Sequence, residues 1–258
     1  MLSDADLERY SRQLLLPGLA IAGQERLAGA RVLVLGLGGL GSPAALYLAA
    51  AGVGSLVLVD GDCVEASNLQ RQLAHGESDL GRNKARSAAD AVAAHNSATR
   101  VEVVAERADE RLLRRLAART DLAVDGSDNY PARFALNRAC IAAQVPLVSA
   151  AAVRTEGLIA TLHPAAGTGC YRCLAPEEGA ASALRCSESG VLGPVVGVLG
   201  SLLALEALKV LSGYPGDLRG AVLTLDLADY RVQRLALAPR PDCPDCGGGR
   251  PAGGPPSP

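Results

Sequence analysis

The sequence predicts an α/β fold: a mostly parallel sheet in the N-terminal half, then mixed or antiparallel strands in the C-terminal half. The first observation is residues 31–60, where an apolar run, a glycine-rich turn, an Ala/Leu-rich segment and a second apolar run follow one another. This order is typical of a βαβ unit. The second is that apolar runs and helical patterns alternate as far as about residue 150, and after it a strand pattern follows without a long helix.

The βαβ unit is the centre of the predicted sheet. Arg31–Leu35 and Ser55–Val59 are expected to be buried strands, with a helix over Pro43–Ala51 between them. The intervening turn contains Gly36, Gly38, Gly39 and Gly41. Glycines allow a close approach of the backbone to phosphate, and a helix N-terminus offers free N–H groups to an anion. With Asp60 positioned to accept hydrogen bonds from a ribose, the unit predicts a Rossmann-like nucleotide site, a fingerprint that NAD enzymes share.

The remaining elements follow from periodicity and from turn residues. Ser3 is a plausible N-cap for a first helix that runs to about Leu15 and ends before Pro17–Gly18. Further helices are expected at about 23–27, 83–95, 110–118, 130–144 and 194–211. Further strands are expected at 100–105, 121–125, 146–150, 155–162, 221–226 and 231–237. The Gly/Pro/Ser-rich tail 248–258 is expected to be disordered.

Composition excludes several classes of partner. A net charge of −2 and a pI of about 6.0 do not suggest a nucleic-acid or membrane-surface binder. The start of the chain is polar, unlike a secretory leader. The longest apolar run, 191–205, contains Pro194 and is shorter than the ~20 residues of a membrane span. We therefore expect a buried helix there and a cytoplasmic protein.

Two CxxC pairs predict a metal centre. Cys170 and Cys173 lie in CYRC, and Cys243 and Cys246 lie in CPDC. In a cytosolic chain such pairs favour metal binding over disulfides. Four thiolates suit tetrahedral Zn²⁺, and because no catalytic histidine is nearby, a closed structural site is expected. The alternative, four unrelated free thiols, is disfavoured by the repeated spacing.

Three side chains suggest that the nucleotide is a triphosphate. Arg71 and Lys84 follow the second strand, and Lys84 falls in the first turn of a helix, where a cation is unfavourable unless an anion lies beside it. Asp128 follows the carboxyl end of the fourth strand, the edge at which open α/β sheets bind ligands. A triphosphate needs such cations together with Mg²⁺ and an acid to hold it. The set favours ATP over NAD.

Seven motifs occur in one order: RYSRQ, GLGGLG, SNLQRQ, GRNKA, DGSDN, CYRC and CPDC. In this the chain resembles the ThiF/MoeB/HesA family, bacterial relatives of ubiquitin-activating enzymes, from about residue 4 to 247. The resemblance implies one adenylation domain over 1–247, with a nucleotide-binding half at about 28–150 and a carrier-binding, zinc-bearing half at about 151–247. It implies that ATP activates the terminal Gly-Gly carboxylate of a ubiquitin-like sulfur-carrier protein (ThiS-type or MoaD-type) for thiamin or molybdopterin biosynthesis, releasing pyrophosphate.

The resemblance also implies roles for particular residues. The four glycines of the turn and Asp60 would hold the ribose and phosphates, and the triphosphate would be lined by Ser67, Asn68, Gln70, Arg71 and Lys84. Asp128 would bind Mg²⁺, with Asn129 beside it. Arg12 matches an arginine that crosses from a partner subunit, which implies a homodimer. The four cysteines of the CxxC pairs match the zinc ligands.

Some questions stay open at this stage. Cys186 matches a loop cysteine that thiamin-pathway members use covalently and molybdopterin-pathway members do not need. No rhodanese-like domain follows CPDC, so a separate sulfur donor, a cysteine desulfurase or a rhodanese, is expected. An NAD-dependent oxidoreductase would explain the glycine turn and Asp60 but not Arg71 or Lys84. A non-catalytic module that docks a ubiquitin-like protein is disfavoured because Asp128, Lys84 and Arg71 are intact.

Overall fold

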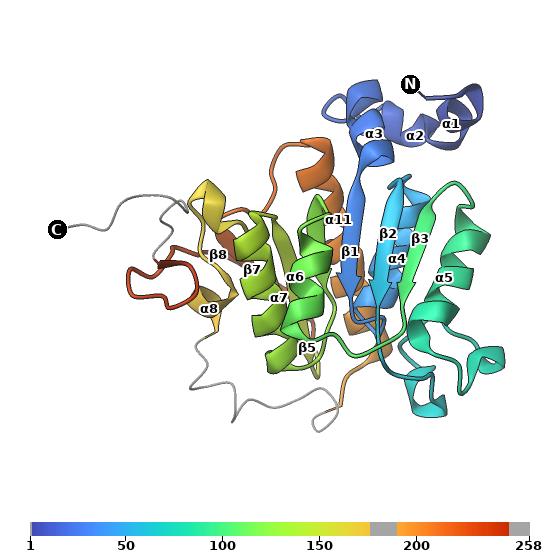
Figure 1. Cartoon of the computed structure of the whole chain (residues 1–258). Helices are drawn as coiled ribbons and strands as arrows, with labels where there is room; N and C mark the ends of the chain where they lie inside the picture. Colours follow the sequence, from blue (N-terminus) through green and yellow to red (C-terminus); the bar gives the residue numbers. More distant parts are fainter. Residues whose placement is uncertain (1, 176–189, 248–258) are drawn as a thin grey trace.

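The computed structural model describes residues 2–175 and 190–247, and within them one sheet runs through both halves of the chain (Figure 1). Its strand order is β3-β2-β1-β4-β5-β6-β7-β8. Neighbours from β3 to β5 pair in parallel, and neighbours from β5 to β8 pair antiparallel. The strands are β1 (Arg31–Leu35), β2 (Ser55–Val59), β3 (Arg100–Val104), β4 (Leu122–Asp125), β5 (Leu147–Val153), β6 (Glu156–Leu162), β7 (Ala221–Asp226) and β8 (Arg231–Ala236). The predicted fold class is confirmed.

Helices cover both faces of the parallel part of the sheet (Figure 1). One face packs against α4 (Gly41–Ala50), α5 (Lys84–His95) and α11 (Gly193–Ser212). The other packs against α6 (Glu110–Ala117) and α7 (Tyr130–Ala143). The strands between them read as unbroken apolar runs because both faces are buried; β2 is buried at every position. The structure also contains α3 (Ala20–Gly29), α8 (Tyr171–Leu174), η1 (Ala66–Asn68), η2 (Glu77–Asp79) and η3 (Pro164–Ala166).

The first predicted helix is in fact two, α1 (Asp4–Arg9) and α2 (Ser11–Leu14), so the prediction of one continuous helix was wrong. Ser3 does cap α1, through a capping box with Asp6. The break falls at Tyr10, whose backbone leaves the helical region with φ −96° and ψ 10°. Tyr10 is only 5% exposed, and its burial against the rest of the chain sets the direction of the backbone at this point.

Helix α11 is a core helix. Among the helices that the structure describes, it alone is long and apolar enough to span a membrane by length and composition. It packs against α4, β5 and β6, with Leu199 and Leu203 fully buried. Its buried Glu206 accepts a hydrogen bond from the N–H of Leu218 at 2.7 Å. The predicted buried helix is thus confirmed.

Candidate active site

The glycine turn between β1 and α4 is held by close backbone contacts. Gly36 has φ +81°, a conformation that favours glycine. A Cβ on Gly41 would lie 1.8 Å from the carbonyl oxygen of Gly36, and a Cβ on Gly126 would lie 2.6 Å from the nitrogen of Gly41. The turn therefore packs against itself and against the end of β4, and α4 begins with its N–H groups directed at the same edge of the sheet.

Replacing Gly41 by alanine should displace the turn. The substitution is expected to lower the free energy of unfolding by about 1–3 kcal/mol, the usual cost of overpacking, and to weaken ATP binding because the turn must move. Gly29→Ala is the matched control, since nothing lies within 4 Å of a Cβ at Gly29. Urea denaturation and calorimetric ATP titration measure both effects. Equal stability and affinity in the two variants would contradict this view of the turn.

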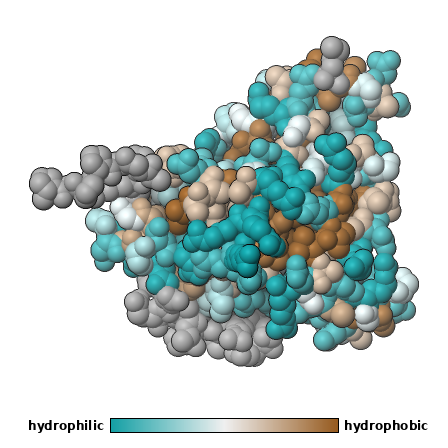
Figure 2. Space-filling view, in the orientation of Figure 1, coloured by the Kyte–Doolittle hydropathy of each residue, from teal (hydrophilic) through white to brown (hydrophobic). Residues whose placement is uncertain are grey.

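A cavity of about 710 Å³ lies at the carboxyl ends of β1, β2 and β4. Its wall contains most of the predicted site residues: Gly36, Gly38, Gly39, Asp60, Arg71, Lys84, Asp128 and Asn129. Gly41, Ser67, Asn68 and Gln70 lie outside this lining. Figure 2 shows the molecule in the orientation of Figure 1. An apolar area lies to the right of the centre of the view, in the region where β2 and β3 run in Figure 1. The cavity thus combines an apolar wall, which includes Leu35 and Val59, with a charged rim.

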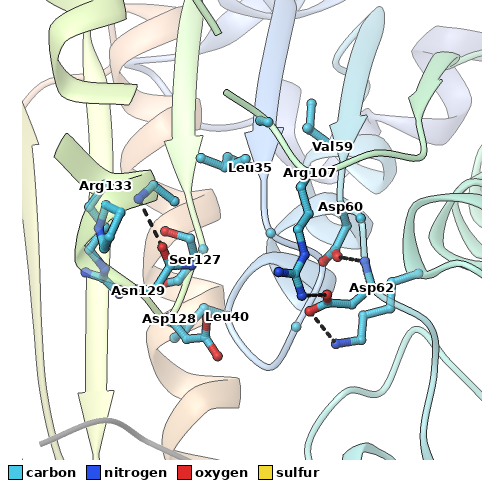
Figure 3. Close-up of a pocket in the computed structure, with 18 of the residues that line it drawn as sticks. Leu35, Leu40, Val59, Asp60, Asp62, Arg107, Ser127, Asp128, Asn129 and Arg133 are labelled. Atoms are coloured by element: carbon cyan, nitrogen blue, oxygen red, sulfur yellow. Dashed lines mark hydrogen bonds and ion pairs between the residues drawn. The ribbon is translucent and has the colours of Figure 1, made fainter. Parts of the chain in front are cut away.

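Asp60 fastens the glycine turn to β2. Its carboxylate accepts hydrogen bonds from the N–H of Leu37 at 2.7 Å and from the N–H of Asp62 at 2.9 Å. Burial raises the pKa of Asp60 above the ordinary range, because the charged form loses hydration. The carboxylate oxygens face the cavity beside the turn (Figure 3), where a ribose hydroxyl can also donate to them.

Lys84 has an anionic neighbour within the chain. Its Nζ lies 3.8 Å from Oδ2 of Asp62, and Nη2 of Arg107 lies 3.3 Å from the other oxygen of the same carboxylate (Figure 3). The Lys84 side chain is 11% exposed, whereas that of Arg107 is 89% exposed. The anion expected beside Lys84 is therefore Asp62 in the free chain. Two cations share one carboxylate, so one positive charge remains available to a phosphate.

Asp128 and Arg71 both line the cavity. The Asp128 carboxylate is exposed and receives no hydrogen bond within the described part of the chain. Figure 3 shows it directed away from Ser127 and Asn129. Arg71 donates from Nη1 to the carbonyl of Ser67 at 2.9 Å. Asn129 is the N-cap of α7, where its Oδ1 accepts from the N–H of Ala132 at 3.0 Å, so its oxygen has a structural partner.

Sequence reasoning missed several lining residues. Gln72 is 3% exposed, and its Oε1 has no hydrogen-bond partner in the described chain. The sequence offered one indication that Gln72 lines the site: it directly follows Arg71, which was predicted to do so. Arg133 is also buried, and it donates to the carbonyl of Ser127 and to the hydroxyl of Tyr171 at 3.3 Å. Because Tyr171 immediately follows Cys170, this contact ties the cavity to the cysteine cluster.

The four cysteines of the CxxC pairs come together although 73 residues separate Cys170 from Cys243. Sγ–Sγ distances are 3.9 Å for Cys170–Cys173, 3.6 Å for Cys170–Cys243 and 3.6 Å for Cys173–Cys246. Thiolates at 2.3 Å around a tetrahedral zinc would be about 3.8 Å apart. Burial raises the pKa of Cys246 to about 11, and a bound cation would favour the thiolate form of this residue. The residues fit a four-thiolate metal site.

The structure does not bring Arg12 to the cavity. Arg12 is exposed on α2, at the opposite end of the sheet (Figure 1). Its neighbour Gln13 bonds to the carbonyl of Ala51, at the C-terminal end of α4, whereas the glycine turn is at the N-terminal end of that helix. The two ends of a ten-residue helix are about 15 Å apart. Cys186 and the tail 248–258 lie outside the described residues.

The fold and the cavity define a nucleotide-binding α/β protein with an additional four-cysteine centre. Residues 10–245 match the ThiF family, and the chain belongs to this family. It is 44% identical to the molybdopterin-synthase adenylyltransferase of Escherichia coli strain K12 over 246 residues, which cover 95% of this chain and 98% of that protein. It is 43% identical to the ThiS adenylyltransferase of the same strain over 247 residues, covering 96% and 98%.

Longer relatives and solved structures match as well. The adenylyltransferase and sulfurtransferase MOCS3 of Bos taurus is 48% identical over 249 residues, and this chain spans 54% of its length. A crystal structure of E. coli MccB with ATP superposes with a TM-score of 0.81 at 26% identity, covering 93% of this chain and 73% of that one.

Proposed function

We propose that this protein is an adenylyltransferase that activates the terminal Gly-Gly carboxylate of a ubiquitin-like sulfur-carrier protein with ATP. The observation that carries the proposal is the content of one cavity. It holds a glycine turn, the basic side chains of Arg71 and Lys84, and the carboxylate of Asp128, which has no hydrogen-bond partner among the described residues. Full-length bacterial relatives with this chain length are named as adenylyltransferases.

The chemistry needs little from a protein except position and charge. An oxygen of the carrier carboxylate attacks the α-phosphorus of ATP, the bond between this phosphorus and the bridging oxygen to the β-phosphate breaks, and pyrophosphate leaves. The products are an acyl-adenylate and pyrophosphate. A carboxylate is already ionised at pH 7, so no general base is required. Catalysis rests on alignment and on stabilisation of the charge that develops on the phosphates.

The roles follow from position in the cavity and from the family motifs. The glycine turn and Asp60 bind the ribose and phosphates. Arg71 and Lys84 balance the phosphate charge. Ser67, Asn68 and Gln70 lie outside the cavity lining, and only the family motif assigns them to the triphosphate. The binding of an anion at Lys84 weakens its pairing with Asp62, which lies 3.8 Å away. Asn129 sets the start of α7 and so holds the backbone beside Asp128.

Two metal ions complete the proposal. Asp128 fits Mg²⁺ because it is an oxygen ligand that faces the cavity and has no protein donor in the described chain. Mg²⁺ when bound neutralises phosphate charge. Zn²⁺ fits the four cysteines, whose sulfur spacings suit tetrahedral coordination. Its role is structural: it holds the second half of the domain, 151–247, which we assign to carrier binding within a single domain of 1–247.

The pathway is thiamin biosynthesis, molybdopterin biosynthesis or both, and identities of 43% and 44% to the two E. coli enzymes do not favour one over the other. We propose a cytoplasmic location and a separate sulfur donor, a cysteine desulfurase or a rhodanese. The direct test is ATP–pyrophosphate exchange with ThiS-type and MoaD-type carriers. Exchange that depends on one of them supports the proposal. If the protein bound NADH and showed no response to ATP, the result would instead favour an oxidoreductase.

We propose that the working unit is a homodimer in which Arg12 of one subunit completes the site of the other. Arg12→Ala and Asp128→Ala homodimers are then both expected to be inactive. A purified mixed dimer of the two variants keeps one complete site and should recover about half of the wild-type exchange activity. An inactive mixed dimer, or a fully active monomer, would contradict this arrangement.

A further inference from the structure

The side chains around Arg12 form hydrogen bonds to the rest of the chain, whereas Arg12 itself is exposed to solvent. Arg9 donates from Nη1 to the carbonyl of His95 at 3.1 Å. The hydroxyl of Tyr10 accepts from Nδ2 of Asn96 at 2.9 Å. Gln13 donates from Nε2 to the carbonyl of Ala51 at 3.1 Å. Three side chains of the motif RYSRQ are thus used to dock the segment, and its second arginine is left exposed.

The docking surface is polar and largely buried. Gln24 is fully buried, and it accepts from Nε2 of Gln13 at 2.8 Å while donating to the carbonyl of Ala51 at 2.9 Å. Asn96 is 1% exposed, and its Nδ2 also donates to the carbonyl of Ala49 at 2.8 Å. These two carbonyls lie at the C-terminal end of α4, where Ala51 is the C-cap; the carbonyl of Ala49 also accepts from the N–H of Gly52 at 3.0 Å.

The close approach of the segment requires a glycine. Gly52 follows α4 with φ +90°. A Cβ at this position would lie 2.6 Å from Nε2 of Gln24 and 2.6 Å from Cζ of Tyr10. The ring of Tyr10 and the amide of Gln24 therefore lie directly against the backbone of the α4 C-terminus. These contacts fix the distance and the direction of the Arg12 segment relative to the C-terminal end of α4.

We propose that Tyr10 and Gln13 are positioning residues: their hydrogen bonds to Asn96, Gln24 and Ala51 fix the segment that presents Arg12 to the partner's active site. The inference rests on the proposed homodimer and deepens it. When a long arginine side chain binds across a subunit boundary, both its rotamers and the backbone that carries it lose conformational entropy. A segment whose backbone is already fixed reduces the backbone part of this loss.

A second interpretation must be separated from this one. The same contacts lie at the C-terminal ends of α4 and α5, and the N-terminal ends of these helices carry the glycine turn and Lys84. Tyr10 and Gln13 would then act on the nucleotide site of their own chain. The two interpretations predict that activity is lost when the substitution is placed on different subunits of the dimer: on the subunit that supplies Arg12 in the first, and on the subunit that holds the nucleotide site in the second.

The experiment uses purified mixed dimers. One chain, the site chain, carries Arg12→Ala and keeps Asp128. The other, the arm chain, carries Asp128→Ala and keeps Arg12. The single complete site then lies on the site chain and uses the arginine of the arm chain. Gln13→Met is added to either chain, so that both dimers contain the same substitutions in total and differ only in their arrangement. Tyr10→Phe, which removes one hydroxyl, is tested in the same way.

With Gln13→Met on the arm chain, we expect kcat of pyrophosphate exchange to fall about 10-fold or more, because small displacements of an aligned group are costly. On the site chain it should fall less than about twofold. Tyr10→Phe should show the same asymmetry. Equal losses in both arrangements, a loss confined to the site chain, or no loss in either would overturn the inference. An inactive parent mixed dimer would overturn the homodimer proposal itself, and the inference with it.

Discussion

Asp128→Ala is expected to lower carrier-dependent ATP–pyrophosphate exchange by about 10²- to 10³-fold, the usual effect of removing one preorganised electrostatic group. In the free chain this carboxylate lines the cavity, and none of the described residues donates a hydrogen bond to it. Its removal therefore breaks no hydrogen bond in the part of the chain that the structure describes. The loss should appear in kcat, and in the Mg²⁺ dependence of ATP binding measured by calorimetry.

Asp90→Ala is the matched control for this substitution. It removes the same group from the solvent face of α5, where the side chain is 69% exposed and pairs with Arg82. We expect unchanged exchange, because surface ion pairs contribute about 0–1 kcal/mol and neither residue of this pair lines the cavity. If Asp128→Ala retained the exchange rate of Asp90→Ala, the assignment of Asp128 to the reaction would fail.

Cys243→Ser is expected to have the largest effect on stability. The change should release zinc and lower the free energy of unfolding by about 4 kcal/mol, as expected for loss of a structural metal, which corresponds to about 10 °C in Tm for a chain of this size. Cys243 is 3% exposed, and its sulfur lies 3.6 Å from that of Cys170. Removing one ligand leaves three thiols, which cannot complete a tetrahedral set of four around the metal.

Elemental analysis and thermal unfolding test this together. We expect one zinc per chain in the native protein and a lower Tm after chelation. Cys63→Ser is the control, because that thiol is exposed and outside the cluster. Native protein that contains no zinc after expression in zinc-supplemented medium, or a Cys243→Ser variant that melts with the Cys63→Ser control, would show that the cluster has no structural metal.

Much of the fold was predictable because the strands are short apolar runs with clear ends. The bounds of β1, β2 and β7 agree with the runs in the sequence, since a glycine or a charged residue stands at or next to each end of these runs. The break at Tyr10 was not predictable in the same way. It depends on burial of a ring against Asn96, a residue 86 positions away, and local helix propensity contains no such information.

The candidate site was predictable where a side chain follows a strand end. Asp60 and Asp128 belong to this class, and both line the cavity. Asp62 and Arg107 were missed because their ion pair joins two loops, and no periodic pattern fixes how two loops meet. Arg12 is a different case. Its proposed role needs a second subunit, so neither the sequence pattern nor one folded chain brings it to the cavity.

The central claim is that the protein activates the C-terminal carboxylate of a sulfur carrier with ATP. Its most direct test is pyrophosphate exchange into ATP with an intact Gly-Gly carrier and with the same carrier lacking its last glycine. The account predicts exchange with the intact carrier, and loss of exchange when the carrier is absent or shortened. Exchange that proceeds equally without a carrier, or that is absent with intact ThiS-type and MoaD-type carriers alike, would contradict it.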